Sequence, residues 1–146
     1  MTPEQKQLLR DTWSAVGAMG DTAAALFYDR LFEIDPTVRP LFAGADMTAQ
    51  RGKLLQALAL VVAALDRLDS MVPALEELGR RHLTYGVRKR HYRSVGAALL
   101  WTFERGLGDA WTQEAEEAWA QAYAIVSAIM AAAAEEAATQ DRPATG

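Results

Sequence analysis

The sequence predicts a single all-α domain of about seven or eight helices. Helix-starting and helix-ending residues recur along the whole chain of 146 residues, and no segment shows the alternation of apolar and polar residues that is typical of a strand. Hydrophobic residues make up 51% of the chain and Ala dominates them, which favours helices. Residues 1–138 are expected to form the domain, and residues 139–146 a flexible C-terminal tail.

The first helix has clear signals at both ends. Thr2, Pro3 and Gln5 are typical of an N-cap, a first-turn proline and a capping-box partner. Gly17 and Gly20 are expected to end this helix. Its buried stripe is predicted to be Leu9, Trp13 and Val16.

The next elements are separated by a proline turn and a corner. Asp21 is expected to cap a second helix, which Asp35 and Pro36 break before a short turn-like helix. Residues 41–47 are predicted to form a corner loop, and Thr48 to cap a long helix. The apolar stripe of that long helix is Leu54, Leu58, Val61, Leu65 and Leu68.

Three more helices complete the predicted fold. One contains His82 and lies between Pro73 and Gly86, and another covers about residues 92–106. The last begins after Thr112 and continues by propensity through a run of alanines.

Charge and composition exclude several classes of function. The net charge of −4 argues against broad nucleic-acid binding, and the absence of Cys excludes disulfides, iron–sulfur clusters and thiol nucleophiles. The N-terminus lacks a signal-peptide core, and the longest apolar run, residues 57–65, is too short to span a bilayer. We therefore expect a cytoplasmic protein without membrane insertion. The basic residues form one local cluster: Arg80, Arg81, Arg88, Lys89, Arg90 and Arg93. Such a cluster is either a solvated face or a binding site for anionic groups.

His82 is the most informative residue of the chain. Leu75, Leu78, His82 and Tyr85 recur at spacings of three and four, which places them on one helical face that should turn inward. An imidazole in a core is costly unless it has a partner, and neutral imidazole is the commonest metal ligand in proteins. The alternative is a core histidine that is hydrogen-bonded to a backbone carbonyl.

Several residues match one family pattern in their order and separation. Pro36 and Phe42, six apart, match a helix-opening proline and a phenylalanine that packs on haem. QRGKL at residues 50–54 matches a distal helical segment, and His82 within RRHLTYGV falls at the position of an iron ligand. Together they resemble the single-domain bacterial globins related to the haem domain of flavohaemoglobins. This resemblance implies a globin fold that encloses a haem pocket.

The resemblance assigns roles around a haem b. His82 would be the proximal iron ligand, which keeps the sixth position open for O₂, CO or NO. Phe42 would stack on the porphyrin, and Leu54 would form the apolar wall near the ligand. Lys53 and Arg81 could pair with the haem propionates. The proximal side would be lined by Leu75, Leu78 and Val87.

On the distal side, Tyr28 and Gln50 fall where the family keeps a tyrosine and a glutamine. A phenol in a dry pocket donates a hydrogen bond, which should stabilise O₂ more than CO because the O₂ ligand carries partial negative charge. The same pair suggests NO dioxygenation as a catalytic role. The alternative for Tyr28 is a buried tyrosine satisfied by the backbone.

Two departures from the family pattern concern redox chemistry. Tyr92 stands where a tyrosine supports the proximal histidine, but the supporting glutamate position is taken by Ala134, with Glu135 one residue later. No flavin module is expected after the globin domain, so turnover would need a separate flavin reductase. His91, with its basic neighbours, is interpreted as a surface or interface histidine.

The resulting hypothesis is a haem protein that reversibly binds O₂, CO and NO at a five-coordinate iron, with NO dioxygenase activity as an extension. A haem-based gas sensor that signals to a partner protein is the alternative. A helical bundle without a cofactor is a third interpretation, and it would leave His82 without a purpose.

Overall fold

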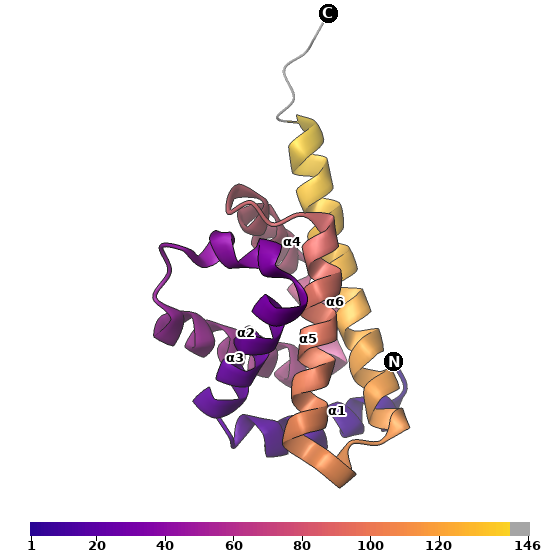
Figure 1. The fold of residues 1–146 in the computed structure, drawn as a ribbon. Coiled ribbons are helices and arrows are strands. Elements are labelled where there is room, and N and C mark those ends of the chain that lie inside the picture. Colours follow the sequence, from indigo (N-terminus) through magenta and orange to yellow (C-terminus); the bar gives the residue numbers. More distant parts are fainter. Residues whose placement is uncertain (141–146) are drawn as a thin grey trace, which may run out of the picture.

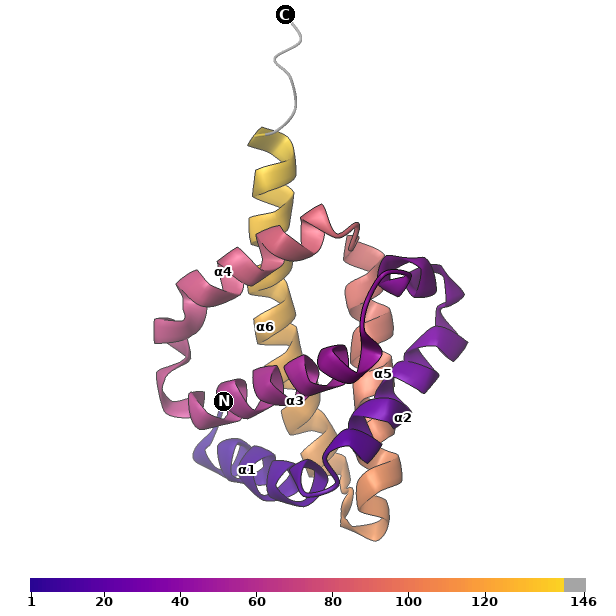
Figure 2. The ribbon, with the colours of Figure 1, turned by 90° about the vertical axis from the view of Figure 1, so that its left-hand side faces the viewer.

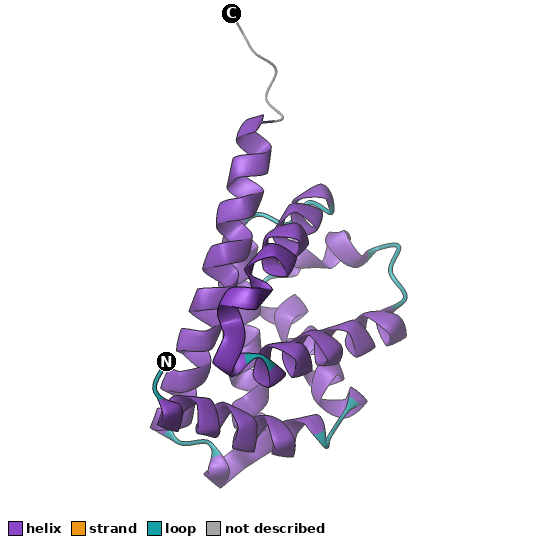
Figure 3. Cartoon of the chain, turned by 180° about the vertical axis from the view of Figure 1, so that it is seen from behind, coloured by secondary structure: helices purple, strands orange, loops and turns teal. Residues whose placement is uncertain are grey.

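The computed structural model describes residues 1–140, and all regular secondary structure in this range is helical (Figure 3). The elements are α1 (Pro3–Gly17), α2 (Asp21–Ile34), η1 (Pro36–Phe42), α3 (Met47–Ala63), η2 (Leu65–Arg67), α4 (Leu68–Thr84), α5 (Lys89–Leu107), η3 (Gly108–Ala110) and α6 (Gln113–Gln140), where η marks a 3-10 helix. The all-α prediction is confirmed. Of the predicted C-terminal tail, Thr139 and Gln140 belong to α6, and residues 141–146 lie outside the described residues.

Helix α6 is the element around which the others are arranged (Figure 1). It packs against α4, α1 and α5, while α5 packs in turn against α2. Helix α3 lies on α1 and α2. Figure 2 shows α3 and α4 diverging from their junction at η2, so that they line opposite sides of the fold interior.

Large apolar side chains from distant segments form the core. Leu9, Leu31, Phe103 and Trp119 are almost completely buried, and each contributes on the order of 1.5–3 kcal/mol through burial. The Trp119 indole N–H donates to the Thr12 hydroxyl at 2.8 Å, which joins α6 to α1 without an unpaired polar group.

Two glycines allow the helices to approach closely. A Cβ at Gly79 would lie 2.2 Å from the Met130 carbonyl oxygen, so α4 can cross α6 at this distance only without a side chain. A Cβ at Gly96 would lie 2.8 Å from the Tyr123 ring, which sets the approach of α5 to α6 in the same way.

The helix starts agree with the sequence analysis in part. The Thr2 capping box is present, and the Asp35 side chain accepts a hydrogen bond from the Thr37 amide at the start of η1. The N-cap of α2 is Gly20 rather than Asp21, which is the first helical residue.

The predicted cap of the long helix was wrong by two positions. The Asp46 side chain, not that of Thr48, accepts hydrogen bonds from the Thr48 and Ala49 amides at 3.0 and 3.4 Å. Asp and Thr are both good N-cap residues, and the earlier one captures the free amides, so α3 already begins at Met47.

Candidate functional site

His82 lies in the last turn of α4 and is half-buried. Its Nδ1 is 2.7 Å from the Leu78 carbonyl oxygen. Because a carbonyl only accepts, Nδ1 must carry the hydrogen, and in the neutral ring the lone pair is then on Nε2. Burial lowers the pKa of His82, as does the Arg81 charge, while the bond to Leu78 opposes this. The ring is therefore a neutral imidazole with Nε2 free to bind a metal.

The contact of His82 with Leu78 is also the bond that an ordinary core histidine would make. The other ring nitrogen, Nε2, makes no hydrogen bond within residues 1–140, which leaves this atom available to a metal.

The turn after α4 closes the site on one side. Gly86 has a φ of +92°, in the region that favours glycine, and ends the helix that carries His82. A Cβ there would lie 3.1 Å from the Leu41 side chain, so this turn is in close contact with η1. Val87 and Phe42, the neighbours of these two residues in sequence, are both half-buried.

Tyr28 lies on α2 in a cluster of aromatic rings. Its ring centroid is 5.6 Å from that of Phe42 in an edge-to-face arrangement and 4.9 Å from that of Phe27. The residue is only 6% exposed. Burial raises the pKa of the phenol, and the Gln50 side chain lies close enough to lower it again in part. Tyr28 is therefore a neutral hydrogen-bond donor at any physiological pH.

The Tyr28 hydroxyl makes no hydrogen bond to a backbone carbonyl in the described part of the chain, as the alternative interpretation would require. Gln50 on α3 is a polar neighbour of this hydroxyl, although the pair falls short of full hydrogen-bond geometry. The structure thus brings together the two predicted distal residues.

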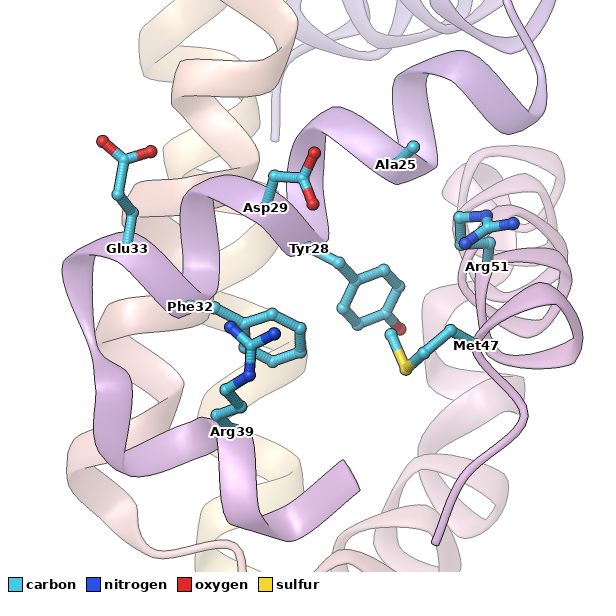
Figure 4. Close-up of a pocket in the computed structure, with 8 residues that line it drawn as sticks. All are labelled: Ala25, Tyr28, Asp29, Phe32, Glu33, Arg39, Met47 and Arg51. Atoms are coloured by element: carbon cyan, nitrogen blue, oxygen red, sulfur yellow. The ribbon is translucent and has the colours of Figure 1, made fainter. Parts of the chain in front are cut away.

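A cavity of about 390 Å³ opens between α2, η1 and α3 beside Tyr28 (Figure 4). It is lined by Ala25, Tyr28, Asp29, Phe32, Glu33, Arg39, Met47 and Arg51. In Figure 4 the Tyr28 ring and the Met47 side chain point toward each other inside it. The Arg51 Nε lies 2.7 Å from the Asp21 Oδ1 in an ion pair, which holds the guanidinium at the border of the cavity.

Of this lining, only Tyr28 was predicted as a site residue in the sequence analysis. Phe32 follows Tyr28 by four positions and Met47 precedes Gln50 by three, so helical spacing could have indicated these two. Arg51 is adjacent to Gln50 in sequence, and helical spacing does not place it on the same face. Arg39 comes from η1, and its guanidinium stacks 5.2 Å over the Phe32 ring.

The residues present fit a haem. Phe42, Leu54, Leu78 and Val87 are apolar yet only half-buried, so they offer apolar surface that the protein itself does not cover. They come from η1, α3, α4 and the turn after α4. Helix α4 also carries His82, and α3 also carries Gln50. A neutral imidazole with a free Nε2, together with apolar side chains that are not fully covered, matches a planar iron-bearing cofactor.

Other residues that were predicted for the haem site lie apart from this group of apolar side chains or lack a partner in it. Lys53 and Arg81 are exposed, and Arg81 lies 3.9 Å from Glu77 in a surface ion pair. The Tyr92 hydroxyl is buried and has no hydrogen-bond partner within residues 1–140. Ala134 is buried, whereas Glu135 is exposed, so the carboxylate one residue later does not replace the missing glutamate.

The prediction for His91 was wrong. It is 3% exposed rather than on the surface. Its Nδ1 accepts a hydrogen bond from the Arg88 amide at 2.8 Å, so the ring folds back over the start of α5. Its Nε2 is buried without a partner in the described structure. Burial and the Arg90 and Arg88 charges lower the pKa of His91, which Asp35 opposes.

Within residues 1–140, no cluster of three His, Asp or Glu side chains is arranged to hold a metal ion. None of the described helices is long and apolar enough to cross a membrane.

Residues 25–130 match the family model for globins. The chain belongs to the globin family. This membership supports a haem cofactor and small gas ligands, and it confirms the resemblance that the sequence indicated.

Individual globins and related proteins agree with this assignment. The chain is 29% identical to the flavohemoprotein of Bacillus subtilis, over 83% of this chain and 31% of that protein, and thus spans about a third of that relative's length. It is 33% identical to the flavohemoprotein of Bordetella parapertussis, over 89% of this chain and 33% of that protein. It is also 29% identical to the neuroglobin of Chaenocephalus aceratus, over 89% of this chain and 90% of that one.

Two solved structures have the same fold. A bacterial globin from Campylobacter jejuni matches with a TM-score of 0.82 and 24% identity, over 94% of this chain and 99% of that one. An engineered carbene transferase from Rhodothermus marinus, named as a candidate nitric oxide dioxygenase, matches with a TM-score of 0.84 and 25% identity, over 96% and 97%.

Proposed function

We propose that this globin binds haem b through His82 and reversibly binds O₂, CO and NO at a five-coordinate ferrous iron. The observation that carries the proposal is the bond from His82 Nδ1 to Leu78, because it orients this ring and leaves its other nitrogen, Nε2, free. Haem iron held by one imidazole supplies an open coordination position for a diatomic ligand. The haem is non-covalent, because the sequence contains no Cys for thioether links.

The surrounding residues hold the cofactor in this proposal. Phe42, Leu54, Leu78 and Val87 pack against its faces, which removes their remaining apolar surface from water. Lys53 and Arg81 pair with its carboxylates from the surface, where such pairs contribute little. The domain extends through α6 to Gln140, two residues beyond the predicted boundary at residue 138, and we place the protein in the cytoplasm.

The distal residues select the ligand. Tyr28 donates a hydrogen bond from a buried position, and Gln50 orients that hydroxyl and can donate as well. Both donors favour a polar ligand over CO. The cavity between α2 and α3 gives small molecules a way to Tyr28, past Met47 and Arg51.

NO dioxygenation is the second candidate function. It is supported by the buried donor at Tyr28 and by the similarity to the Rhodothermus marinus protein, which is named as a candidate for that activity. Tyr92 belongs to the proximal side in this proposal, but it lacks the carboxylate partner at position 134 that would strengthen the proximal ligand. Each turnover would use an electron from an external flavin reductase.

The visible spectrum of the purified protein tests the first proposal. The ferric form, the dithionite-reduced form and the reduced form with CO are compared. An intense Soret band, a high-spin five-coordinate ferrous form and a shift on CO addition are expected. A low-spin ferrous spectrum would contradict the open site, and no haem signal after addition of hemin would contradict the whole proposal.

The dioxygenase role is tested separately. NO is added to the oxygenated protein in the presence of a flavin reductase and NADPH, and NO loss and nitrate formation are followed over many turnovers. Stoichiometric nitrate with a single turnover only, despite a working reductase, would leave ligand binding as the function.

A further inference from the structure

One segment of the chain carries a strong local positive charge. Between residues 78 and 103 the sequence has six Lys or Arg residues and no Asp or Glu, whereas the remaining residues have a net charge of −10. The six basic residues are all exposed: Arg80, Arg81, Arg88, Lys89, Arg90 and Arg93. Together with Tyr85 they are called the basic face below.

The basic face lies where α4 ends and α5 begins, at one corner of the fold (Figure 2). Arg80 and Arg81 have a single acidic neighbour, Glu77, one turn earlier in α4. Within the described residues, the other four cations form no ion pair. The Asp35 carboxylate accepts a hydrogen bond from the Ser94 hydroxyl and forms no ion pair with these cations in the described structure.

The position of these cations opposes the stability of α5. Lys89 and Arg90 open the helix, Arg93 follows one turn later, and no acidic residue lies in the first turn. The helix dipole disfavours positive charge at this end. A charge pattern that works against its own helix is consistent with a role in contacting something outside the chain.

Tyr85 supplies a second, independent feature. It is 64% exposed, one of only three large hydrophobic residues of residues 1–140 that are exposed. It caps α4 between Arg81 and Arg88, three residues after His82. Tyr and Arg are the residue types that most often anchor protein–protein interfaces.

We propose that the basic face is the docking surface for an acidic flavin protein that delivers electrons to this globin. The proposal rests on the proposed haem function. Docking at this face would bring the donor against the segment that carries His82. One electron would pass from the reduced flavin of the partner to the ferric iron, which becomes ferrous, and no group would be transferred.

The chemistry of the face favours a protein over another polyanion. A nucleic acid is long and would meet the acidic remainder of the molecule on either side. A protein partner with a compact acidic patch avoids that repulsion and uses the exposed Tyr85 as an apolar anchor. Complementary charge would also speed the encounter and make it sensitive to salt.

The test uses the haem-loaded protein and a flavodoxin, a small acidic FMN protein, as the probe. Binding of the oxidised flavodoxin is measured by calorimetry, and reduction of the ferric globin by the reduced flavodoxin is measured by stopped flow. The triple variant Lys89→Gln, Arg90→Gln and Arg93→Gln is compared with Lys6→Gln, Arg67→Gln and Arg105→Gln, which changes the net charge equally away from the basic face. Arg81 is left unchanged because it is assigned to the cofactor.

We expect the first triple variant to weaken binding and slow reduction about tenfold at low salt, and the second to change both less than about twofold. Tyr85→Ser should weaken binding without any change of charge. Raising NaCl from about 20 to about 300 mM should slow the reduction of the wild-type globin by flavodoxin and leave the reduction rate of the first triple variant nearly unchanged.

Three results would overturn the proposal. The first is an equal loss of flavodoxin binding in both triple variants, and the second is no loss of binding in any variant. The third is tighter binding of the protein to duplex DNA or to phosphatidylglycerol vesicles than to flavodoxin. Dithionite reduction and CO binding in every variant report on the haem function separately. If the protein takes up haem and binds CO but does not bind flavodoxin, the docking proposal is contradicted and the haem proposal is not.

Discussion

The Nδ1 atom of His82 lies 2.7 Å from the carbonyl oxygen of Leu78, one turn earlier in α4. This bond fixes both the orientation of the ring and the position of its proton, so the nitrogen that could bind iron is set before a cofactor arrives. The side chain is therefore positioned by its own helix, and α4 is in turn positioned by its close crossing of α6 at Gly79.

Replacing His82 should abolish stable haem binding. The His82→Ala protein is expected to lose its Soret band after gel filtration, because the variant lacks the imidazole that is proposed to bind the iron. His91→Gln serves as the control and should retain the band, because His91 is bonded to the start of α5. An unchanged haem spectrum in His82→Ala would refute the proximal assignment.

Tyr28→Phe should speed O₂ release by about tenfold or more and CO release by much less. The phenol is a neutral donor in a buried position, and a hydrogen bond of about 1.4 kcal/mol corresponds to a factor of ten. Dissociation rates of both gases from the ferrous protein provide the measurement. Equal acceleration of both would show that the substitution opens the pocket rather than removing a donor.

Gly→Ala substitutions at Gly79 and at Gly52 should change stability in opposite directions. At Gly79 a Cβ would lie 2.2 Å from the Met130 carbonyl, so Gly79→Ala should lower the free energy of unfolding by about 2–3 kcal/mol. At Gly52, in the middle of α3, a Cβ meets nothing within 4 Å, so Gly52→Ala should raise it by about 0.5–1 kcal/mol. Urea unfolding measures both, and a loss at Gly52 would contradict the open surface there.

The buried His91 predicts a loss of stability in acid. Burial holds its pKa below the ordinary value near 6.5, so below that pH the unfolded chain binds a proton that the folded chain does not. Stability should therefore be complete above this pH and fall as the pH is lowered through it. Protonation would also remove the acceptor of the Arg88 amide.

The matched variant for this effect is His91→Gln. Gln at the third helical position can reach back to the N-cap amide in a capping box and does not titrate. The variant should resemble the wild type at neutral pH and lose less stability between about pH 7 and pH 5. An identical slope in both proteins would assign the acid sensitivity to other groups.

Much of this site could be predicted from sequence because its main residues lie on regular helices. Helical spacing placed His82 and Leu78 on one face, and the resemblance placed Tyr28 and Gln50 together on the distal side. The cap at Asp46 and the burial of His91 could not be predicted in the same way. Two good capping residues lay close together in the first case, and in the second a local bond to Arg88 outweighed the polar neighbours. The cavity beside Tyr28 combines side chains from three elements, and only the folded chain defines it.

The last prediction concerns Tyr92, whose buried hydroxyl has no partner in the described structure. An unpaired buried hydroxyl costs about 1–3 kcal/mol, so Tyr92→Phe should leave the stability of the haem-free protein unchanged or raise it by about 1 kcal/mol.

Tyr123→Phe is the matched comparison. The Tyr123 hydroxyl donates to the Tyr92 carbonyl, so its removal should cost about 1 kcal/mol. Thermal unfolding of both variants, with and without haem, separates the possibilities. A loss of haem affinity in Tyr92→Phe would show that the cofactor side of the protein supplies the missing partner. A loss of stability without haem would show that the hydroxyl is paired in solution.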